Sequence, residues 1–364
     1  MDRNQTILIG VVILLAAGIF LLLFNPGQVL GERAGLIRDV GPSDLNVSQK
    51  EGRFPLAPDW ASYAGVINGP DGDNLSLRDL GGKVVLVDFW TYSCINCIRT
   101  LPYAESWYEK YKADGLVVVG MHSPEFDFEK QRSNVEAAVK ANNLTYPIVL
   151  DPDHRLWDEF GNSYWPRHYL IDKDGFIRYD HIGEGAYEET ANAIVSVLNE
   201  GKPMNVSNAS VKAEPVDFLR VGTPELYFGG NFRREALGNS GVAVPGSGAM
   251  RFTLPDTLAP NRIYLVGDWK DDGEQMELVS DAGQIVLPFS AMAVHLVADS
   301  AHESAVRVEV DGNLHIGPEA DANGDVRIDE SRLYRLVKMD DYGTHVMRAN
   351  ITGAGFRAYS FTFG

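Results

Sequence analysis

Hydrophobic and polar positions follow two different patterns along this chain. Between residues 54 and 201, short apolar runs typical of strands alternate with segments of helical periodicity. Strands are predicted at 84–90, 116–121, 147–150, 168–172 and 176–180, and helices at 95–113, 128–141, 154–160 and 186–198. The Asp-Lys-Asp-Gly sequence at 172–175 predicts a hairpin turn. This order favours an α/β domain with a mixed central sheet flanked by helices.

The pattern changes after residue 201. Residues 202–215 are polar and rich in helix and strand breakers, which predicts a linker. From residue 216 to 364, short alternating segments recur without long helical periodicity, which is typical of an all-β sandwich. Its strands are predicted at 262–269, 275–280, 284–288, 293–298, 305–310, 333–338, 345–351 and 356–363, with turns at 311–312 and 341–343.

The N-terminal region carries one long uncharged apolar run, residues 6–24. About 20 such residues span a bilayer as a single transmembrane helix. A cleaved signal peptide is the alternative, but its apolar core is shorter and ends in a small-residue cleavage site. The sequence therefore predicts a membrane anchor at 1–30, followed by a polar tether at 31–53.

Composition narrows the possible functions. The formal net charge is −18, which argues against nucleic acid as a partner. The chain has two cysteines, and both lie in the sequence Ser-Cys94-Ile-Asn-Cys97 directly after the strand at 84–90.

A Cys-x-x-Cys pair at the start of a helix after a strand is typical of a redox dithiol. Unpaired N–H groups and the helix dipole favour a thiolate at Cys94, and Cys97 is close enough to resolve a mixed disulfide. If the two cysteines were half of a zinc site, a second pair of ligands would be needed. A purely structural disulfide is also disfavoured, because a bond that closes a four-residue ring adds little stability. We therefore expect a redox-active disulfide and no metal or organic cofactor.

Asp88 and Trp90 flank the dithiol on the preceding strand. A carboxyl group on a core strand is costly unless it has a role, so Asp88 is a candidate proton acceptor for Cys97. The alternative places Asp88 outward at a sheet edge. Trp90 is expected to shield Cys94 and to contact substrate, or simply to pack in the core.

Trp165 and Pro166 immediately precede the strand at 168–172. A cis proline there would hold the backbone beside the dithiol and remove a competing N–H. Trp165 could then pair with an extended substrate backbone.

Other candidates have structural explanations of equal or greater weight. His122 and Glu125 follow a strand end, where sites of α/β sheets gather, although His122 fits a structural role better. Residues 321–329 resemble part of a calcium loop but have Arg332 where an acidic ligand is needed, which favours a surface turn. Trp269, Tyr227 and Tyr334 could form a sugar-stacking platform or be core residues.

Longer stretches carry a family resemblance. The sequences VDFWTYSCINCIRTLP, GMHSPEF and YWPRHYLIDKDG resemble the extracytoplasmic thioredoxin-like domain of the DipZ group, which is related to the TlpA and ResA membrane-tethered thiol–disulfide oxidoreductases. TPELYFGG, LVGDW, RLYRLV and FTFG resemble the carbohydrate-binding-module-like sandwich appended to that domain. The resemblance covers about residues 54–364.

The resemblance implies a thioredoxin-like fold and specific roles. Cys94 would be the nucleophile, Cys97 the resolving thiol, Asp88 the buried acid and Pro166 the cis proline. It implies reduction of disulfide-containing client proteins on the extracytoplasmic side of the cell membrane. DipZ proteins usually carry a multi-helix electron-conducting domain where this chain has a single predicted anchor, so the implied electron donor is a separate membrane protein of CcdA type.

Two other functions remain open at this stage. A thiol peroxidase would oxidise Cys94 rapidly with peroxide, although the surrounding Trp-Thr-Tyr-Ser-Cys differs from the usual peroxidase setting. A surface protein that binds glycan or a partner would use the sandwich, and the dithiol would be incidental.

Overall fold

The structure, a computed structural model, describes residues 41, 45–60, 63–69, 75–200, 216–239, 241 and 243–364. The apolar run at 6–24, most of the predicted tether and the predicted linker at 202–215 lie outside these residues. Among the helices described, none has the length and apolar character needed to cross a membrane.

The first part of the chain, up to residue 200, is an α/β unit. Its described strands form one mixed sheet in the order β1-β4-β3-β2-β5-β6, in which β2, β3 and β4 are parallel to one another and the other pairings are antiparallel. The elements are α3 (Val47–Glu51), β1 (Val66–Ile67), η1 (Arg78–Leu80), β2 (Val84–Trp90), α4 (Ile95–Tyr111), η2 (Lys112–Asp114), β3 (Leu116–His122), η3 (Asp127–Lys130), α5 (Arg132–Ala141), β4 (Ile148–Leu150), α6 (Arg155–Glu159), β5 (Arg167–Ile171), β6 (Ile177–Ile182) and α7 (Tyr187–Leu198). The predicted mixed sheet with flanking helices is confirmed.

Strand β2 is the centre of this unit, and all seven of its residues are buried. Val84, Leu86 and Trp90 pack in the core that also holds residues of α4, α5 and α7. The alternate residues Val85 and Val87 pack in a second core on the other face of the sheet. A strand covered on both faces is apolar at nearly every position. This continuous apolar run is why β2 could be predicted correctly from the sequence.

Most differences from the predicted elements lie at helix ends and in short elements. Helix α4 ends at Tyr111 because the next three residues form a 3₁₀ turn that stops at Gly115, whose φ is 104°. Helix α5 begins at Arg132, not near residue 128, because residues 127–130 form η3. The sequence did not predict α3, β1 or η1, which are too short to show a periodic pattern.

The second part, from residue 216, is all-β, as predicted. Its elements are β7 (Leu226–Tyr227), β8 (Ala249–Phe252), β9 (Tyr264–Asp271), β10 (Met276–Leu278), β11 (Ala282–Ser300), β12 (Ser304–Val310), β13 (Asn313–Leu314), β14 (Asp325–Ile328), β15 (Arg332–Thr352) and β16 (Phe356–Phe363). These described strands form one continuous ten-stranded sheet that folds back on itself, since β11 pairs with β9, β15 and β16.

The sequence prediction divided two long strands into shorter ones. Residues 284–288 and 293–298 are parts of the single strand β11, and 333–338 and 345–351 are parts of β15. The predicted turn at 341–343 was wrong, because this segment lies inside β15 at an irregularity in its pairing with β11. Such irregularities bend a strand without ending it, so each long strand takes part in pairing in two regions of the folded sheet.

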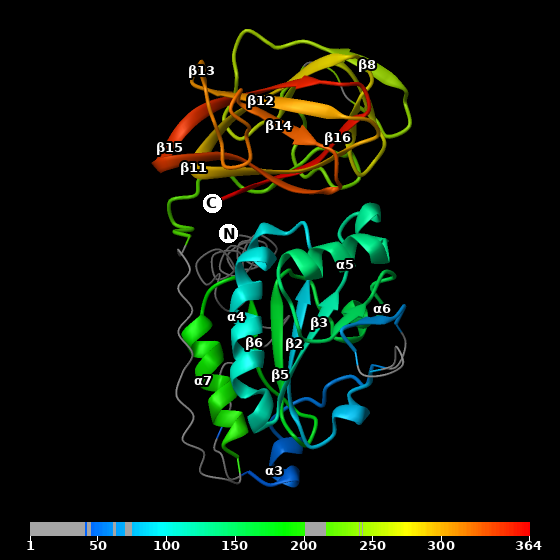
Figure 1. The fold of residues 1–364 in the computed structure, drawn as a ribbon, viewed down its shortest axis with the longest axis vertical. Helices are drawn as coiled ribbons and strands as arrows, with labels where there is room; N and C mark the ends of the chain where they lie inside the picture. Colours follow the sequence, from blue (N-terminus) through cyan, green and yellow to red (C-terminus); the bar gives the residue numbers. More distant parts are fainter. Residues whose placement is uncertain are drawn as a thin grey trace, which may run out of the picture.

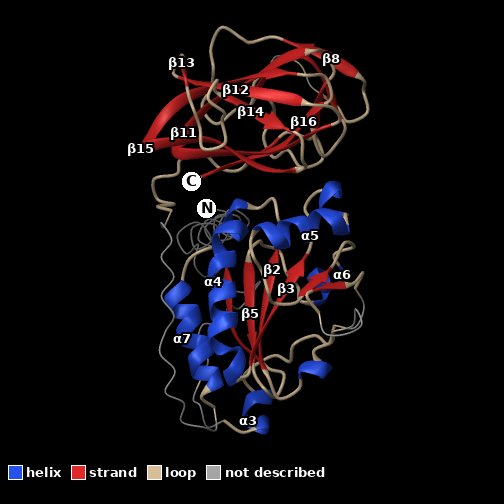
Figure 2. Ribbon diagram, in the orientation of Figure 1, coloured by secondary structure: helices blue, strands red, loops and turns tan. Residues whose placement is uncertain are grey.

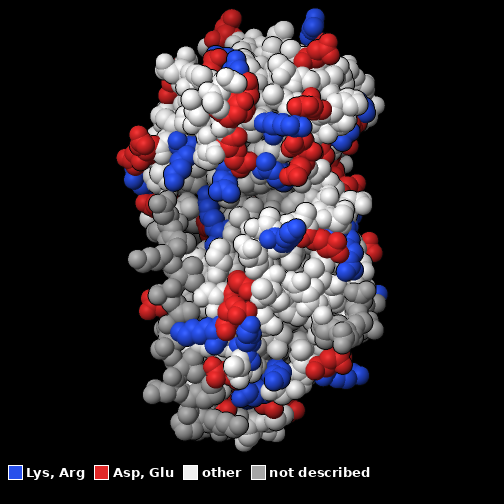
Figure 3. Space-filling model, viewed as in Figure 1, with Lys and Arg blue, Asp and Glu red and all other residues white. Residues whose placement is uncertain are grey.

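The β-rich part lies against one end of the α/β unit, at the end from which α4 begins (Figure 1). Helices α4 and α7 lie side by side on one face of the sheet (Figure 2), and the rings of Tyr103 and Tyr187 stack between them with centroids 3.5 Å apart. On the face shown in Figure 3, acidic and basic side chains are interspersed.

Lys50 of α3 joins the end of the predicted tether to the domain. Its side chain is 3% exposed, and its Nζ lies 2.8 Å from Asp172, 2.7 Å from Asp174 and 3.0 Å from Glu200. Burial opposes the charge, but hydrogen bonds to these carboxylates outweigh it and raise the pKa of Lys50 above its ordinary value. Arg178 also pairs with Asp172 and Glu200, so this is a buried ion network.

We predict that Lys50→Ala lowers the free energy of unfolding by about 3 kcal/mol, because it leaves buried carboxylates without full compensation. Lys112→Ala is the control, since Lys112 forms an exposed pair with Glu109 and should change stability by less than about 0.5 kcal/mol. Urea denaturation measures both, and equal small changes would show that α3 is not part of the stable domain.

Candidate active site

The two cysteines lie where β2 passes into α4. Cys94 is the N-cap of α4, and its Sγ accepts a hydrogen bond from the backbone N–H of Cys97 at 3.2 Å. Both cysteines are free thiols. Because the first N–H groups of a helix lack intrahelical partners, they are available to donate to a sulfur at this position.

The two thiols have different surroundings. Cys94 is partly exposed, whereas Cys97 is completely buried. Burial, followed by the hydrogen bond to Cys94 and the charge of Cys94, raises the pKa of Cys97 well above its ordinary value. The negative charge of Asp88 acts in the same direction. The structure therefore provides one accessible sulfur and one sulfur that retains its proton.

Asp88 points into the core from β2, which excludes the alternative position at a sheet edge. It is 1% exposed, and its Oδ1 lies 3.3 Å from Nε2 of His168 on β5. The sequence did not single out His168. No signal along the chain could have done so, because the pairing of β2 with β5 is what brings it opposite Asp88.

The Trp165–Pro166 peptide bond is cis, as the family resemblance implied. Trp165 is partly exposed, its Nε1 donates to the carbonyl of Ser123 at 3.0 Å, and its ring lies 4.2 Å from that of Trp157. The indole is thus held at the surface by contacts on two sides. The exposed part of the ring lines a cleft.

Trp90 requires a correction. Trp90 is fully buried, and its ring contacts that of His122 edge-on at 5.2 Å. The expectation that Trp90 contacts substrate is therefore wrong, and the alternative that it packs in the core is correct. His122 has a structural role: burial lowers its pKa to about 3, and its ring stacks on Tyr92. Both side chains support the dithiol loop from inside the core.

Glu129 is a further buried residue that sequence reasoning missed. Its carboxylate accepts the hydroxyl of Ser93 at 2.6 Å and the backbone N–H groups of Ser93, Glu125 and Phe126. Ser93 directly precedes the nucleophile. Glu129 therefore fixes the dithiol loop to the loop that follows β3, and several charge-assisted hydrogen bonds make this connection strong.

The β-rich part covers one side of the dithiol. Ile95, between the two cysteines, is 5% exposed because it lies in a cluster formed by both parts of the chain. We call this the interdomain cluster; its members are Ile95, Ile98, Phe126, Phe128, Tyr227, Phe232, Val297, Leu333 and Tyr359. The ring of Tyr359 lies 5.0 Å from Phe126 and 4.8 Å from Phe128.

Polar contacts surround this cluster. Tyr92 donates to the carbonyl of Ser331 at 3.2 Å, and Arg99 contacts Nε2 of His295 at 3.3 Å. Arg99 also pairs with Glu184, which follows β6. The β-rich part is therefore held against the first turns of α4 by apolar packing and by side-chain hydrogen bonds.

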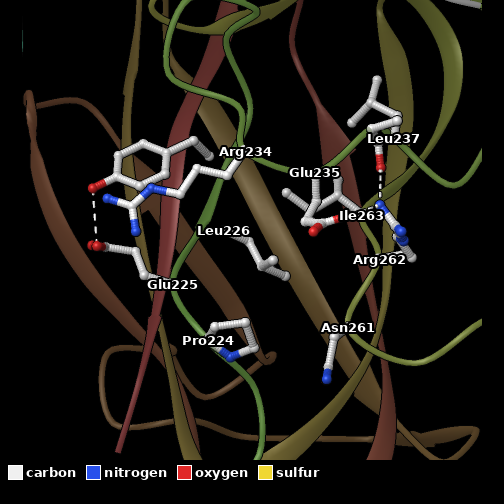
Figure 4. Close-up of a pocket in the computed structure, with 11 residues that line it drawn as sticks. Pro224, Glu225, Leu226, Arg234, Glu235, Leu237, Asn261, Arg262 and Ile263 are labelled. Carbon is white, nitrogen blue, oxygen red and sulfur yellow. Dashed lines mark hydrogen bonds and ion pairs between the residues drawn. The ribbon is translucent and has the colours of Figure 1, made fainter. Parts of the chain in front are cut away.

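A cleft of about 610 Å³ remains between the two parts beside Trp165. Its walls include Trp165, Pro124 and His154 from the α/β unit, and Phe232 and Arg234 from the β-rich part. A second pocket of about 230 Å³ shares the wall formed by Tyr227 and Arg234. In Figure 4, Arg234 and Glu225 lie on the same side of this smaller pocket.

In the wall that the two pockets share, two carboxyl groups contact the same tyrosine hydroxyl group. Tyr227 Oη lies 2.6 Å from Glu125 and 2.9 Å from Glu225. A phenol has one proton to donate, so the second short contact requires a protonated carboxyl group as donor. Burial, then the charge of Glu225, raises the pKa of Glu125 to about 8. The pKa of Glu225 is also raised, mainly by burial.

This arrangement predicts a pH-dependent stability. A carboxyl group with a pKa of 4.5 unfolded and about 8 folded binds more protons in the folded state, so stability falls as pH rises through that window and levels off above it. Glu125→Gln keeps a hydrogen-bonding group without the titration, and the decline in the free energy of unfolding should become shallower. Denaturant titrations between about pH 5 and pH 9 measure this.

Glu136→Gln, at an exposed position on α5, is the control and should keep the wild-type slope. An unchanged slope in Glu125→Gln would contradict the assignment of the shared proton to this pair.

The structure supports the structural explanation both for the three aromatic residues and for the loop at 321–329. Trp269 and Tyr334 are completely buried, and Tyr227 is 7% exposed, so the three aromatic residues belong to cores and interfaces. Asp321 accepts backbone N–H groups of Asn323 and Asp325, which makes the loop a turn. Within the described part of the chain, no three His, Cys, Asp or Glu side chains are grouped suitably for a metal ion.

Comparison with known proteins finds a family match for each part of the chain. Residues 57–180 match the AhpC/TSA family, and residues 223–364 match a family described as a thioredoxin-like C-terminal domain. The chain is 37% identical over 243 residues to Protein DipZ of Mycobacterium bovis, a match that covers 66% of this chain and 34% of DipZ. The chain thus spans about a third of the length of that relative.

Two shorter relatives are covered more completely. Thiol-disulfide oxidoreductase YkuV of Bacillus subtilis is 31% identical over 33% of this chain and 81% of its own length. Thiol-disulfide oxidoreductase ResA of Bacillus thuringiensis is 31% identical over 34% of this chain and 69% of its own length. Both matches are confined to about a third of this chain.

Proposed function

Because this chain belongs to the TlpA/ResA-like family of thioredoxin-like thiol–disulfide oxidoreductases, we propose that it reduces disulfide bonds of client proteins through Cys94 and Cys97. The observation that carries this proposal is the asymmetry of the dithiol. Cys94 is accessible at a helix N-terminus, whereas Cys97 is buried and protonated three residues away. One sulfur is suited to attack and the other to resolution.

The reaction proceeds in two exchanges. The Cys94 thiolate attacks one sulfur of the client disulfide, the client S–S bond breaks, and the other client sulfur leaves as a thiolate. Cys97 then loses its proton to Asp88 and attacks Cys94 Sγ, which releases the second client thiolate. Two electrons pass to the client, whose disulfide is reduced, while the Cys94–Cys97 pair is oxidised.

The reducing direction can be tested by the equilibrium reduction potential of the Cys94–Cys97 pair. We expect a value near −270 mV, at the thioredoxin end of the range. The raised pKa of Cys97 supports this direction, because burial disfavours its thiolate, and a stabilised thiolate in the reduced form is what makes a dithiol pair oxidising. A value near −120 mV would overturn the proposed direction and indicate an enzyme that forms disulfides.

Cysteine variants separate the two exchanges in the same preparation. Cys94→Ser should lower disulfide reduction by about 1,000-fold or more, as expected for loss of the nucleophile. Cys97→Ser should accumulate a mixed disulfide between Cys94 and the client. Peroxide-driven oxidation of Cys94 that outpaces attack on disulfides would instead favour a thiol peroxidase.

We further propose that residues 6–24 anchor the protein in the cell membrane, with residues 54–364 on the extracytoplasmic side. The uncharged run in the sequence supports the anchor, and the need to re-reduce the dithiol there suggests a CcdA-type membrane donor. A membrane-impermeant thiol reagent should label Cys94 in intact cells that express the full chain. Labelling only after lysis would place the dithiol inside the cell and contradict the proposed location.

Deletion of residues 1–30 should move the protein from the membrane fraction to the soluble fraction. The deleted form should reduce client disulfides at the wild-type rate, because the described dithiol site does not include these residues. Retention of the shortened protein in the membrane fraction would argue against the anchor.

A further inference from the structure

Three ionisable side chains form a row across neighbouring strands of the α/β sheet. Asp88 on β2 lies opposite His168 on β5, and His168 lies opposite His181 on β6. Residues directly opposite each other in antiparallel strands project to the same face. This is the face covered by α4, because Leu86 and Leu170 pack with Cys97 in one core. The strands β6, β5 and β2 are neighbours in the sheet, and β5 and β2 are seen beside α4 in Figure 1.

The inner two members of the row are buried without regular hydrogen bonds. Asp88 and His168 are each 1% exposed, and the closest approach of their polar atoms is 3.3 Å, from Oδ1 to Nε2. None of their side-chain polar atoms makes a hydrogen bond of good geometry to a described residue. A buried polar group without a partner costs about 1–3 kcal/mol, so such a pair requires a functional explanation.

His168 is the base next to Asp88. The other titratable groups that face Asp88 are Cys97 of α4, with Cys94 beyond it, and Tyr146 before β4. Burial, then the charge of Asp88, raises the pKa of Tyr146 well above its ordinary value, so this phenol keeps its proton. Trp107 of α4 contacts the His168 ring edge-on at 5.8 Å and is not titratable.

His181 is the outer end of the row. It is half-buried, whereas Asp88 and His168 are buried. The row therefore extends from Asp88, in the buried interior next to Cys97, to His181, which is closer to the surface of the domain. A proton released by Cys97 has no direct contact with solvent, because the thiol is completely buried.

We propose that His168 carries the proton of Cys97 from Asp88 toward His181, and so permits the second exchange. This inference rests on the proposed function. Cys97 gives its proton to the Asp88 carboxylate as its sulfur bonds to Cys94 and the client thiolate leaves. Asp88 passes the proton to Nε2 of His168, and the imidazole releases its other proton from Nδ1 toward His181. No electrons move in the relay, and His168 is a positioning and relay residue that acts through Asp88.

The test uses Ellman's reagent, a small aromatic disulfide, with the reduced full chain. Attack by Cys94 releases a first coloured thiolate, and attack by Cys97 on the mixed disulfide releases a second. In His168→Gln, which keeps hydrogen-bonding groups but cannot relay protons, the first phase should be unchanged. The second phase should slow by about 10- to 100-fold near neutral pH, the scale of general acid–base catalysis.

The pH profile distinguishes relay from packing. The deficit of His168→Gln should shrink as pH rises, because a larger fraction of Cys97 is then already a thiolate when the mixed disulfide forms. Trp107→Phe is the matched control, since it alters packing on His168 without removing a base and should keep the wild-type pH profile. His181→Gln, at the half-buried end, should slow the second phase in the same pH-dependent way and less strongly.

A second phase in His168→Gln with the wild-type rate and pH profile would overturn the relay. The relay is also overturned if Trp107→Phe reproduces the full pH-dependent defect. Release of a single thiolate by the wild-type protein would instead refute the dithiol mechanism itself, so failure of the inference and failure of the proposed function give different results.

Discussion

The burial of strand β2 on both faces is the constraint on which the rest of this molecule depends. The strand sits at the centre of the α/β sheet, so its end defines where the chain can emerge and begin helix α4. Cys94 caps that helix and Cys97 enters its first turn. The same burial places the carboxyl group of Asp88 under the dithiol, where water cannot take up a proton. The difference between the two thiols is thus a direct consequence of how the sheet is covered.

The β-rich part changes what can reach this dithiol. In the described residues it contributes Val297, Leu333 and Tyr359 to the interdomain cluster, which buries Ile95 inside the Cys-x-x-Cys sequence. A bare dithiol on a convex surface could react with many disulfides. Here, the β-rich part packs on Ile95 between the two cysteines and supplies one wall of the cleft beside Trp165. Both parts of the chain therefore form the surroundings of the dithiol.

Buried ionisable groups recur at the positions that connect elements distant in the sequence. Lys50 joins α3 to the β5–β6 hairpin, Glu129 joins the dithiol loop to the loop after β3, and Tyr227 joins Glu225 to Glu125 across the interface. A buried charge or polar group is favourable only with its partners in place. Such groups therefore penalise incorrect packing of these loops and domains more strongly than apolar contacts would.

The sequence by itself determined the thioredoxin-like order of strands and helices, the all-β character of the second part and the residues of the dithiol. Local pattern carries that information, because β2, α4 and Cys-x-x-Cys are contiguous in the chain. Only the tertiary structure decided which residues meet. The pairing of β2 with β5 sets His168 against Asp88, and the covering of β2 on both faces removes Trp90 from the surface. Partners separated along the chain are selected by sheet register and domain packing, and these leave no periodic signal in either partner's own segment.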